Sequence, residues 1–327
     1  MIIEKFKHYP GVHCESTACR DLLAFNGLKL TEGMVFGLAS GIGFVYWKTK
    51  KMSFPFVGGR IKQDSLIKNL SEVLNLDANL RETTSKEKAW KALRENLDAE
   101  IPTGLKLDMY YLDYLPKKIH FPAHYVVACG YGSKYVYLAD TSFKGIQKTE
   151  IKSLEEARSA RGFMSSKNLS FTFEKIHGKL DLKKAIEKAI EKTVEEMFNA
   201  TIANLGVKGI FKFSREIKKW HEMENLGDCL KNHYMMWEEA GTGGAGFRRL
   251  YSEFLRESSK ILKNRDIKTA AKYFEKVADH WTSINLELLK LRRKRTGIEK
   301  ALEEISGRIE AQAVAERDVF HLLGKAV

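Results

Sequence analysis

A cysteine at the start of a predicted helix is the residue of this chain best suited to nucleophilic chemistry. Cys14 stands in the segment His13-Cys14-Glu15, directly before an apolar helical pattern that ends near Gly27. The positive end of a helix dipole favours the thiolate, which is the reactive form of cysteine. A thiolate nucleophile needs a base, usually histidine, and a third group that orients the base. The alternative is that Cys14 is a small buried apolar residue, as most cysteines are.

A predicted hairpin supplies a histidine and an aspartate as partners. Residues 124–140 read as two strands around a turn at Gly130–Ser133. If the register is symmetric about residue 132, His124 and Asp140 lie opposite each other on one face. A carboxylate there fixes the tautomer of the imidazole and stabilises its protonated form. A one-residue slip would separate the pair, so this is a hypothesis about register; otherwise His124 merely begins a strand and Asp140 merely ends one.

The order of these residues, with a cysteine near the N-terminus and histidine and aspartate more than 100 residues later, is that of papain-like cysteine enzymes. The segment Tyr9–Trp47 also resembles the N-terminal domain of the butirosin biosynthesis protein H family. The shared features are the His-Cys-Glu segment, the triplet Leu30–Glu32 and the Gly-rich run Gly37–Phe44. Two departures are small: Thr31 stands where serine is common, and Ser40 stands within the glycine run.

The C-terminal half resembles the helical domain that usually follows in this family, through the segments 209–217 and 241–251. The strands of His124 and Asp140 match the later part of the N-terminal pattern, so the resemblance covers most of the chain. It implies a papain-like fold. For the enzyme after which the family is named, it implies transfer of an acyl group from a carrier-protein thioester to an amine. The resemblance does not establish the substrate of this protein.

Three functional hypotheses result. The first is a cysteine-dependent acyltransferase in which Cys14 is the nucleophile, His124 the base and then the acid, and Asp140 the orienting group. Its expected partners are an acyl-thioester donor, with an acidic acyl carrier protein as the candidate, and a small amine acceptor. The second is a papain-like hydrolase, a peptidase or amidase, that uses water as the acceptor. The third is a non-catalytic binding protein on the same fold, which the intact residue set disfavours.

Histidines near these segments are candidates for completing the site. The oxyanion of the reaction needs the N–H of Cys14 and one further donor. Three residues are candidates for that donor or for lining the site: His8, His13 and His120. His120 and His124 have the i, i+4 spacing of a helical metal pair, but Pro122 argues against a helix. We therefore expect no metal and no cofactor.

A glycine-rich segment in the C-terminal half is a second candidate binding site. Its backbone N–H groups, at the start of a predicted helix, would hold an anion or substrate with the help of two arginines. The residues concerned are Gly243, Gly244, Arg248 and Arg249. A tight connection between packed helices is the alternative that we favour. The basic run Arg292–Arg295 is expected to be a solvated face, or to meet an acidic carrier protein.

The elements that position these residues change character near residue 178. Before it, apolar spacing predicts helices over 15–26, 64–76 and 86–97, and alternation predicts strands over 105–115, 124–140 and 169–176. After it, helices are predicted over 180–198, 246–262, 267–294 and 298–323. We therefore expect an α+β, papain-like domain over residues 1–177 and an all-helical domain over 178–327 that covers or shapes the active-site cleft.

Composition narrows the class of protein. A chain of 327 residues is long enough for two domains. The net charge of +13 is spread along a chain with interspersed acidic residues, and without a zinc-finger or RNA-binding motif we expect no nucleic-acid partner. No apolar run suits a membrane span, and residues 1–10 lack a secretory signal. We therefore expect a cytoplasmic protein with free thiols, either monomeric or a homo-oligomer.

Overall fold

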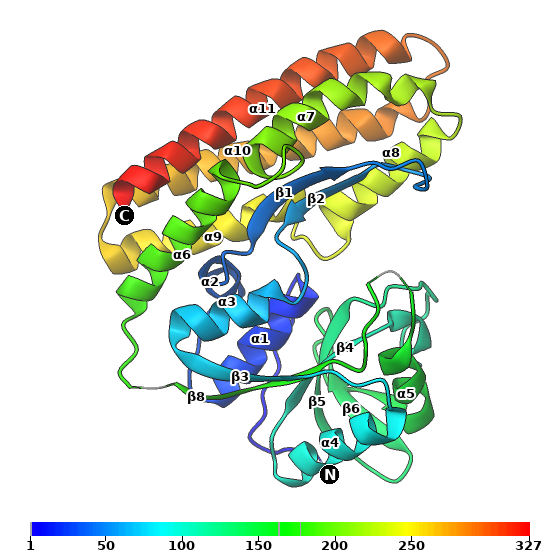
Figure 1. The fold of residues 1–327 in the computed structure, drawn as a ribbon, viewed down its shortest axis with the longest axis vertical. Coiled ribbons are helices and arrows are strands. Elements are labelled where there is room, and N and C mark those ends of the chain that lie inside the picture. Colours follow the sequence, from blue (N-terminus) through cyan, green and yellow to red (C-terminus); the bar gives the residue numbers. More distant parts are fainter. Residues whose placement is uncertain (1, 163, 177) are drawn as a thin grey trace. The chain divides into compact units, whose positions relative to one another are not determined.

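The chain forms two compact units in a computed structural model that describes residues 2–162, 164–176 and 178–327 (Figure 1). Unit 1 comprises Met1–Val35 and Gln63–Leu180, and unit 2 comprises Phe36–Lys62 and Asp181–Val327. Their contents confirm an α+β part followed by a mostly helical part. His177, at the predicted domain boundary, lies outside the described residues.

Unit 1 is built around a six-stranded antiparallel sheet. Its strand order is β3-β8-β4-β5-β6-β7. The strands are β3 (Leu76–Arg81), β4 (Thr103–Leu107), β5 (His124–Tyr131), β6 (Tyr135–Ala139), β7 (Gln147–Glu150) and β8 (Ser170–Ile176). The predicted strands over 124–140 and 169–176 are thus present. The predicted strand 105–115 is wrong beyond Leu107, because the Asp108 side chain accepts the N–H of Tyr110 and starts a 3₁₀ turn, Met109–Tyr111.

The helices of unit 1 are α1 (Cys14–Phe25), α3 (Ser65–Leu74), α4 (Lys86–Asp98) and α5 (Ile151–Ser159). The first three confirm the helices predicted from apolar spacing. The helix α1 packs against β4 and β5 in the middle of the sheet. It ends before Gly27, whose φ of +91° suits glycine and stops the helix. The short helix α2 (Glu32–Leu38) crosses the division between the units, which falls after Val35.

Unit 2 combines one hairpin with a helical bundle. The strands β1 (Ile42–Trp47) and β2 (Phe56–Arg60) form the hairpin. The α-helices are α6 (Leu182–Phe198), α7 (Gly206–Ile217), α8 (Leu226–Tyr234), α9 (Arg248–Leu262), α10 (Arg265–Leu291) and α11 (Ile298–Ala326). The helices α6, α9, α10 and α11 match the four predicted helical segments closely, because each has a buried stripe, whereas α7 and α8 had no predicted range.

The predicted division at residue 177 placed the hairpin in the first domain. In the structure, the hairpin belongs with the helices of unit 2 and not with the six-stranded sheet. The Phe44 ring lies 6.2 Å from Phe213 and 5.9 Å from Trp237, measured between ring centroids. The indole N–H of Trp237 donates to the carbonyl of Val57 at 2.9 Å. Aromatic contacts of this kind are long-range in sequence, so no local pattern in residues 36–62 reveals them.

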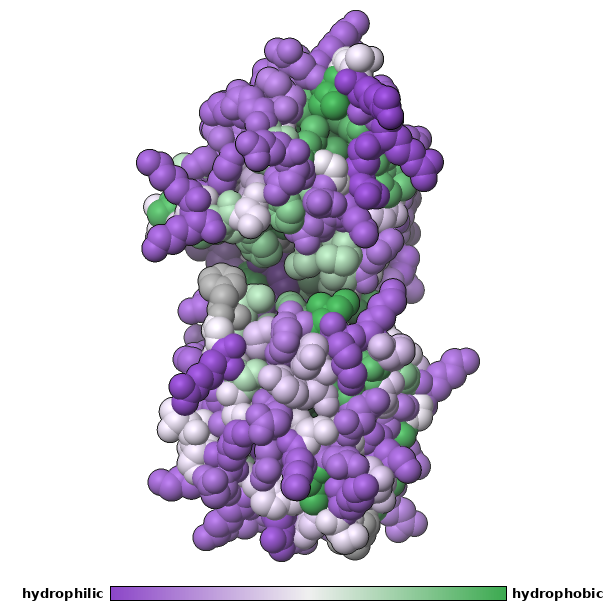
Figure 2. All heavy atoms as spheres, turned by 90° about the vertical axis from the view of Figure 1, so that its right-hand side faces the viewer, coloured by the Kyte–Doolittle hydropathy of each residue, from purple (hydrophilic) through white to green (hydrophobic). Residues whose placement is uncertain are grey.

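The surface is mostly hydrophilic on the face drawn in Figure 2, with apolar residues in small groups. Many of its charges form exposed ion pairs, for example Lys86 with Glu156 at 2.5 Å and Arg249 with Asp279 at 2.9 Å. This agrees with the interpretation of the net charge as a solvated, ion-paired surface. Within the described ranges, no helix has both the length and the apolar character that crossing a membrane requires.

Candidate active site

Cys14 is the first residue of α1 and is set apart from the other cysteines by its exposure. Its side chain is partly exposed, whereas Cys19, Cys129 and Cys229 are buried. Burial raises the pKa of the Cys129 thiol to about 12 and that of the Cys229 thiol to about 11. Because Cys14 opens the helix, its N–H has no acceptor within the helix and remains able to bind an oxyanion.

The preceding residue, His13, fixes the point at which α1 begins. Its Nδ1 accepts the N–H of Ser16 at 3.4 Å, which is the arrangement of an N-cap. The ring is also 3.0 Å from the Ser16 hydroxyl, and His13 is buried. This N-cap role explains why a histidine stands at position 13, and no contact with an oxyanion is needed to explain it.

His124 and Asp140 come together as expected, although the register differs from the prediction. His124 Nε2 donates to Asp140 Oδ1 at 2.9 Å. The strands pair Val127 with Ala139, so continuing this register places Asp140 opposite Val126, two residues from His124. A bulge between Ala128 and Gly130, and a turn between Gly132 and Tyr135, shift the pairing by two residues. Since side chains alternate with a period of two, this shift keeps both groups on one face.

The imidazole joins the thiol to the carboxylate. The Cys14 sulfur is close enough to His124 to contribute to the raised pKa of the imidazole, and with Nε2 occupied by Asp140, the ring nitrogen left for the sulfur is Nδ1. Burial alone would lower the pKa of His124, but the Asp140 carboxylate and the Cys14 sulfur together hold it well above its ordinary value. Burial alone would raise the pKa of Asp140, but His124, Tyr114 and the Thr141 N–H lower it. Both shifts favour an imidazolium–carboxylate pair.

Tyr114 is a contact that sequence reasoning missed. Its hydroxyl donates to Asp140 Oδ2 at 2.7 Å, so each carboxylate oxygen has one side-chain donor. Burial, followed by the Asp140 charge, raises the pKa of Tyr114 well above its ordinary value, which keeps the hydroxyl protonated as a donor. Tyr114 lies in an irregular segment after the 3₁₀ turn, where no periodicity indicates its direction.

The other two candidate histidines are held by different groups. His8 lies between Asp21, 2.5 Å from Nδ1, and the carbonyl of Phe143, 2.9 Å from Nε2. Both ring nitrogens are therefore occupied, and neither is left to donate to an oxyanion. His120 is largely exposed, contacts Asp108 at 2.8 Å and stacks on Tyr110. The described contacts join neither ring to Cys14.

The glycine-rich segment is a tight connection in unit 2. Its N–H groups are used within the unit: that of Gly244 donates to Thr242 Oγ1 at 3.0 Å, and that of Ala245 donates to Glu238 at 3.0 Å. Gly243 and Gly244 have positive φ, which explains their residue type. This supports the alternative that we favoured over an anion site.

The two arginines beside this segment are engaged as well. Arg248 is completely buried and forms an ion pair with Glu316 at 2.9 Å, so the expectation of an anion contact at Arg248 is wrong. Its Nη1 also donates to the carbonyls of Gly43 and Gly59, which joins the hairpin to the bundle. Arg249 pairs with Asp279 on the surface.

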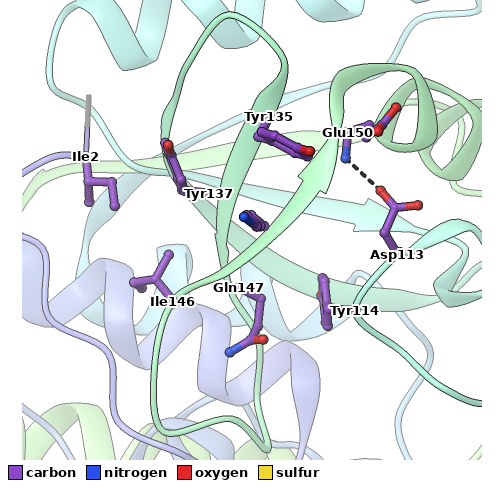
Figure 3. Close-up of a pocket in the computed structure, with 9 residues that line it drawn as sticks. Ile2, Asp113, Tyr114, Tyr135, Tyr137, Ile146, Gln147 and Glu150 are labelled. Carbon is purple, nitrogen blue, oxygen red and sulfur yellow. Dashed lines mark hydrogen bonds between the residues drawn. The ribbon is translucent and has the colours of Figure 1, made fainter.

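A separate pocket of about 590 Å³ lies over β6 and β7 (Figure 3). Tyr114, Tyr135 and Tyr137 line it, and Asp113 accepts the N–H of Glu150 at its side. Neither Cys14 nor His124 lines this pocket, so it is not the reaction site. Tyr114 connects the two places, since it lines the pocket and bonds to Asp140. Among the described residues, no three His, Cys, Asp or Glu side chains gather as metal ligands.

Comparisons with known proteins identify two successive segments. Residues 13–141 match the N-terminal domain of butirosin biosynthesis protein H. Residues 152–323 match a domain of unknown function, DUF4872, whose model starts in α5 and therefore includes the end of unit 1. No protein with a curated description matches the sequence.

One solved structure has a similar chain path over part of the molecule. This structure, from Bacillus anthracis, is described as a C39-like peptidase and is 16% identical in sequence. The match covers 53% of the present chain and 97% of the other, with a TM-score of 0.39.

Proposed function

The chain belongs to the DUF4872 family, here preceded by a domain of the papain-like butirosin biosynthesis protein H type, and we propose that it is a cysteine-dependent acyltransferase. The observation that carries this proposal is the 2.9 Å hydrogen bond between His124 and Asp140, with the Cys14 sulfur close enough to the imidazole to help raise its pKa. A partly exposed thiol at a helix start, linked to a buried imidazole–carboxylate pair, is the arrangement that activates a sulfur nucleophile.

In the proposed reaction, His124 takes the proton of the Cys14 thiol, and the thiolate attacks the carbonyl carbon of an acyl thioester. The N–H of Cys14 donates to the oxyanion that develops. When the tetrahedral intermediate collapses, the bond to the donor sulfur breaks and His124 returns its proton to that sulfur. An amine then attacks the acyl-Cys14 thioester. His124 takes the amine proton and delivers it to the departing Cys14, which releases an amide and regenerates the enzyme.

Asp140 keeps its charge throughout this sequence. It holds the imidazole with Nε2 protonated, so that Nδ1 faces the sulfur as the base. Tyr114 occupies the second carboxylate oxygen and restricts rotation of the Asp140 side chain. The buried position of the pair, with only 14% of the His124 side chain exposed, limits the competition of water for these hydrogen bonds.

The test is acylation of the intact protein by simple acyl thioesters, followed by mass spectrometry. We expect a mass increase of one acyl group on Cys14, absent from Cys14→Ser, and faster discharge by primary amines than by water. Discharge by water alone would replace the proposal with the hydrolase alternative. An enzyme that gains no acyl group from any thioester and cleaves no amide would support the binding protein.

We further propose that the donor is held by an acidic carrier protein. The support is the net charge of +13 and the exposed basic run Arg292–Arg295 between α10 and α11. Transfer from an acidic acyl carrier protein should slow as salt increases, whereas transfer from a neutral small thioester should not. Replacing Arg292, Arg293 and Arg295 by glutamate should weaken the first reaction only; equal salt dependence of both donors would refute this partner.

A further inference from the structure

One carboxylate holds the whole segment that leads into the nucleophile. Glu32 Oε2 accepts the N–H of Val12 at 2.9 Å, and Oε1 accepts the N–H of His13 at 2.8 Å. The same Oε1 accepts the hydroxyls of Ser16 at 2.9 Å and Thr17 at 3.1 Å, both in the first turn of α1. Glu32 thus contacts the residues on both sides of Cys14. Hydrogen bonds to an ionised acceptor are stronger than neutral ones.

The other side of this segment is bonded to the backbone just after β6, next to Asp140. The N–H of Gly11 donates to the carbonyl of Thr141 at 2.8 Å. Gly11 has no room for a side chain, because a Cβ atom there would lie 2.0 Å from Thr17 Oγ1 and 2.6 Å from Glu32 Oε2. The segment therefore fits between Glu32 and the residue next to Asp140.

The placement of Glu32 is itself determined locally. Thr31 Oγ1 accepts the N–H of Met34 at 3.1 Å and caps α2, whose first residue is Glu32. Serine and threonine both serve as N-caps, so threonine at this position keeps the carboxylate in place.

We infer that Glu32 is a positioning residue, which sets the distance of Cys14 from the His124–Asp140 pair by holding the segment 11–17. The inference rests on the proposed function of Cys14 as the nucleophile. Glu32 acts through the backbone and the hydroxyls it binds, and it takes no part in proton transfer.

The direction of the effect separates positioning from simple electrostatics. Glu32 places a negative charge beside the residues that flank Cys14, and a negative neighbour disfavours a thiolate. If charge alone mattered, replacing Glu32 by glutamine would speed the reaction of Cys14. If positioning matters, the same change slows it, because an amide group cannot accept the Val12 and His13 N–H groups through both of its ends.

The experiment measures the alkylation rate of Cys14 by iodoacetamide across pH, together with the melting temperature. In Glu32→Gln, we expect the rate of the folded protein to fall by about ten- to a hundredfold, as a small misplacement of a reacting group does. The matched control is Glu238→Gln in unit 2, since the Glu238 carboxylate also accepts a backbone N–H, a hydroxyl and an amide. This control should lower stability and leave the Cys14 rate unchanged.

A second pair of variants changes the same segment without removing a charge. Gly11→Ala should slow Cys14 in the same way, whereas Gly145→Ala, where a Cβ meets nothing within 4 Å, should not. An unchanged or faster Cys14 rate in folded Glu32→Gln would overturn the inference. Acylation by thioesters is scored separately: if the wild-type protein alkylates normally but is never acylated, the proposed function fails, and the alkylation rates still decide the role of Glu32.

Discussion

Each unit contains a buried charged pair, Arg248–Glu316 in unit 2 and His124–Asp140 in unit 1, and these two pairs differ in where their contacts end. In unit 2, Arg248 and Glu316 are completely buried and most of their partners are buried too, among them the indole N–H of Trp281 at 2.6 Å. In unit 1, Asp140 bonds to His124, and the pKa of this imidazole is also raised by the sulfur of Cys14, which is partly exposed. The first pair is enclosed, whereas the second reaches a reactive atom at the surface.

This difference shows how a structural role of a buried charged pair can be told from a chemical one. Burial and strong hydrogen bonds are common to both pairs, so neither property identifies chemistry. An enclosed pair can act only on stability and on the choice of packing partner. A pair that ends at an accessible nucleophile can pass its electrostatic bias to a reacting atom.

The largest effect is expected when unit 1 is produced without most of unit 2. We expect residues 1–177 expressed alone to be insoluble or inactive, because Phe36, Phe44 and Tyr46, which are buried in unit 2, would lose their partners. Replacing residues 36–62 in that fragment by a Gly/Ser linker of equal length should improve solubility, as measured by light scattering. A soluble, fully active fragment 1–177 would contradict this expectation.

Selective alkylation tests whether Cys14, the partly exposed residue beside the His124–Asp140 pair, is the most reactive cysteine. Near neutral pH, Cys14 should react with iodoacetamide at least about 100-fold faster than Cys129 or Cys229, since each unit of raised pKa lowers the thiolate fraction tenfold. Peptide mapping over time gives the four rates. Unfolding in urea should equalise them, and faster labelling of any buried cysteine in the native protein would remove Cys14 as the nucleophile.

Changing the enclosed pair should affect stability and leave reactivity alone. Glu316→Gln leaves Arg248 without a buried counter-charge and should lower the free energy of unfolding by about 3–5 kcal/mol. The control on the same helix is Glu303→Gln, an exposed partner of Lys218, which should cost less than about 1 kcal/mol. Urea titration measures both, and alkylation of Cys14 in the folded proteins should match the wild type.

Changing the unit 1 pair should affect the reactivity of Cys14 as well as stability. Asp140→Asn removes the charge that raises the pKa of His124, so alkylation of Cys14 at neutral pH should slow by about tenfold or more. The raised pKa of His124 gives stability that is complete below its unfolded value of 6.5 and is lost as pH rises through the folded value. The lowered pKa of Asp140 gives stability that is lost in acid. The stability difference between wild type and variant should therefore be largest near pH 5–6, and a pH-independent difference would refute the coupling.

The smallest expected effect concerns Tyr114. Tyr114→Phe removes one donor to Asp140 and should cost about 1–2 kcal/mol of stability, with a modest slowing of Cys14. Tyr137→Phe, in the same pocket, provides the control. If both variants alkylate at the same rate, Tyr114 contributes to packing only.

The features that could be predicted from the sequence are those that depend on residues close together in the chain. The start of α1 depends on His13 and Ser16, and the shared face of His124 and Asp140 depends only on the parity of a hairpin register. The two-residue shift in that register arises from the position of the turn together with a bulge between Ala128 and Gly130, and no residue pattern signals the bulge. The partners of Arg248 and Phe44 lie far along the chain, and a segment that contains Arg-Arg beside glycines resembles an anion site until its partners are known.

Because the hairpin belongs to unit 2, it cannot pack during protein synthesis until its helical partners have been made. Residues 36–62 leave the ribosome before any part of Asp181–Val327 has been translated. At about 5–20 residues per second, the roughly 120 intervening residues take on the order of ten seconds. For that time unit 1 can assemble only as a sheet with an aromatic loop projecting from the nascent chain. Its aromatic side chains would be exposed to chaperones until α6 and α7, which pack against β1, have been translated.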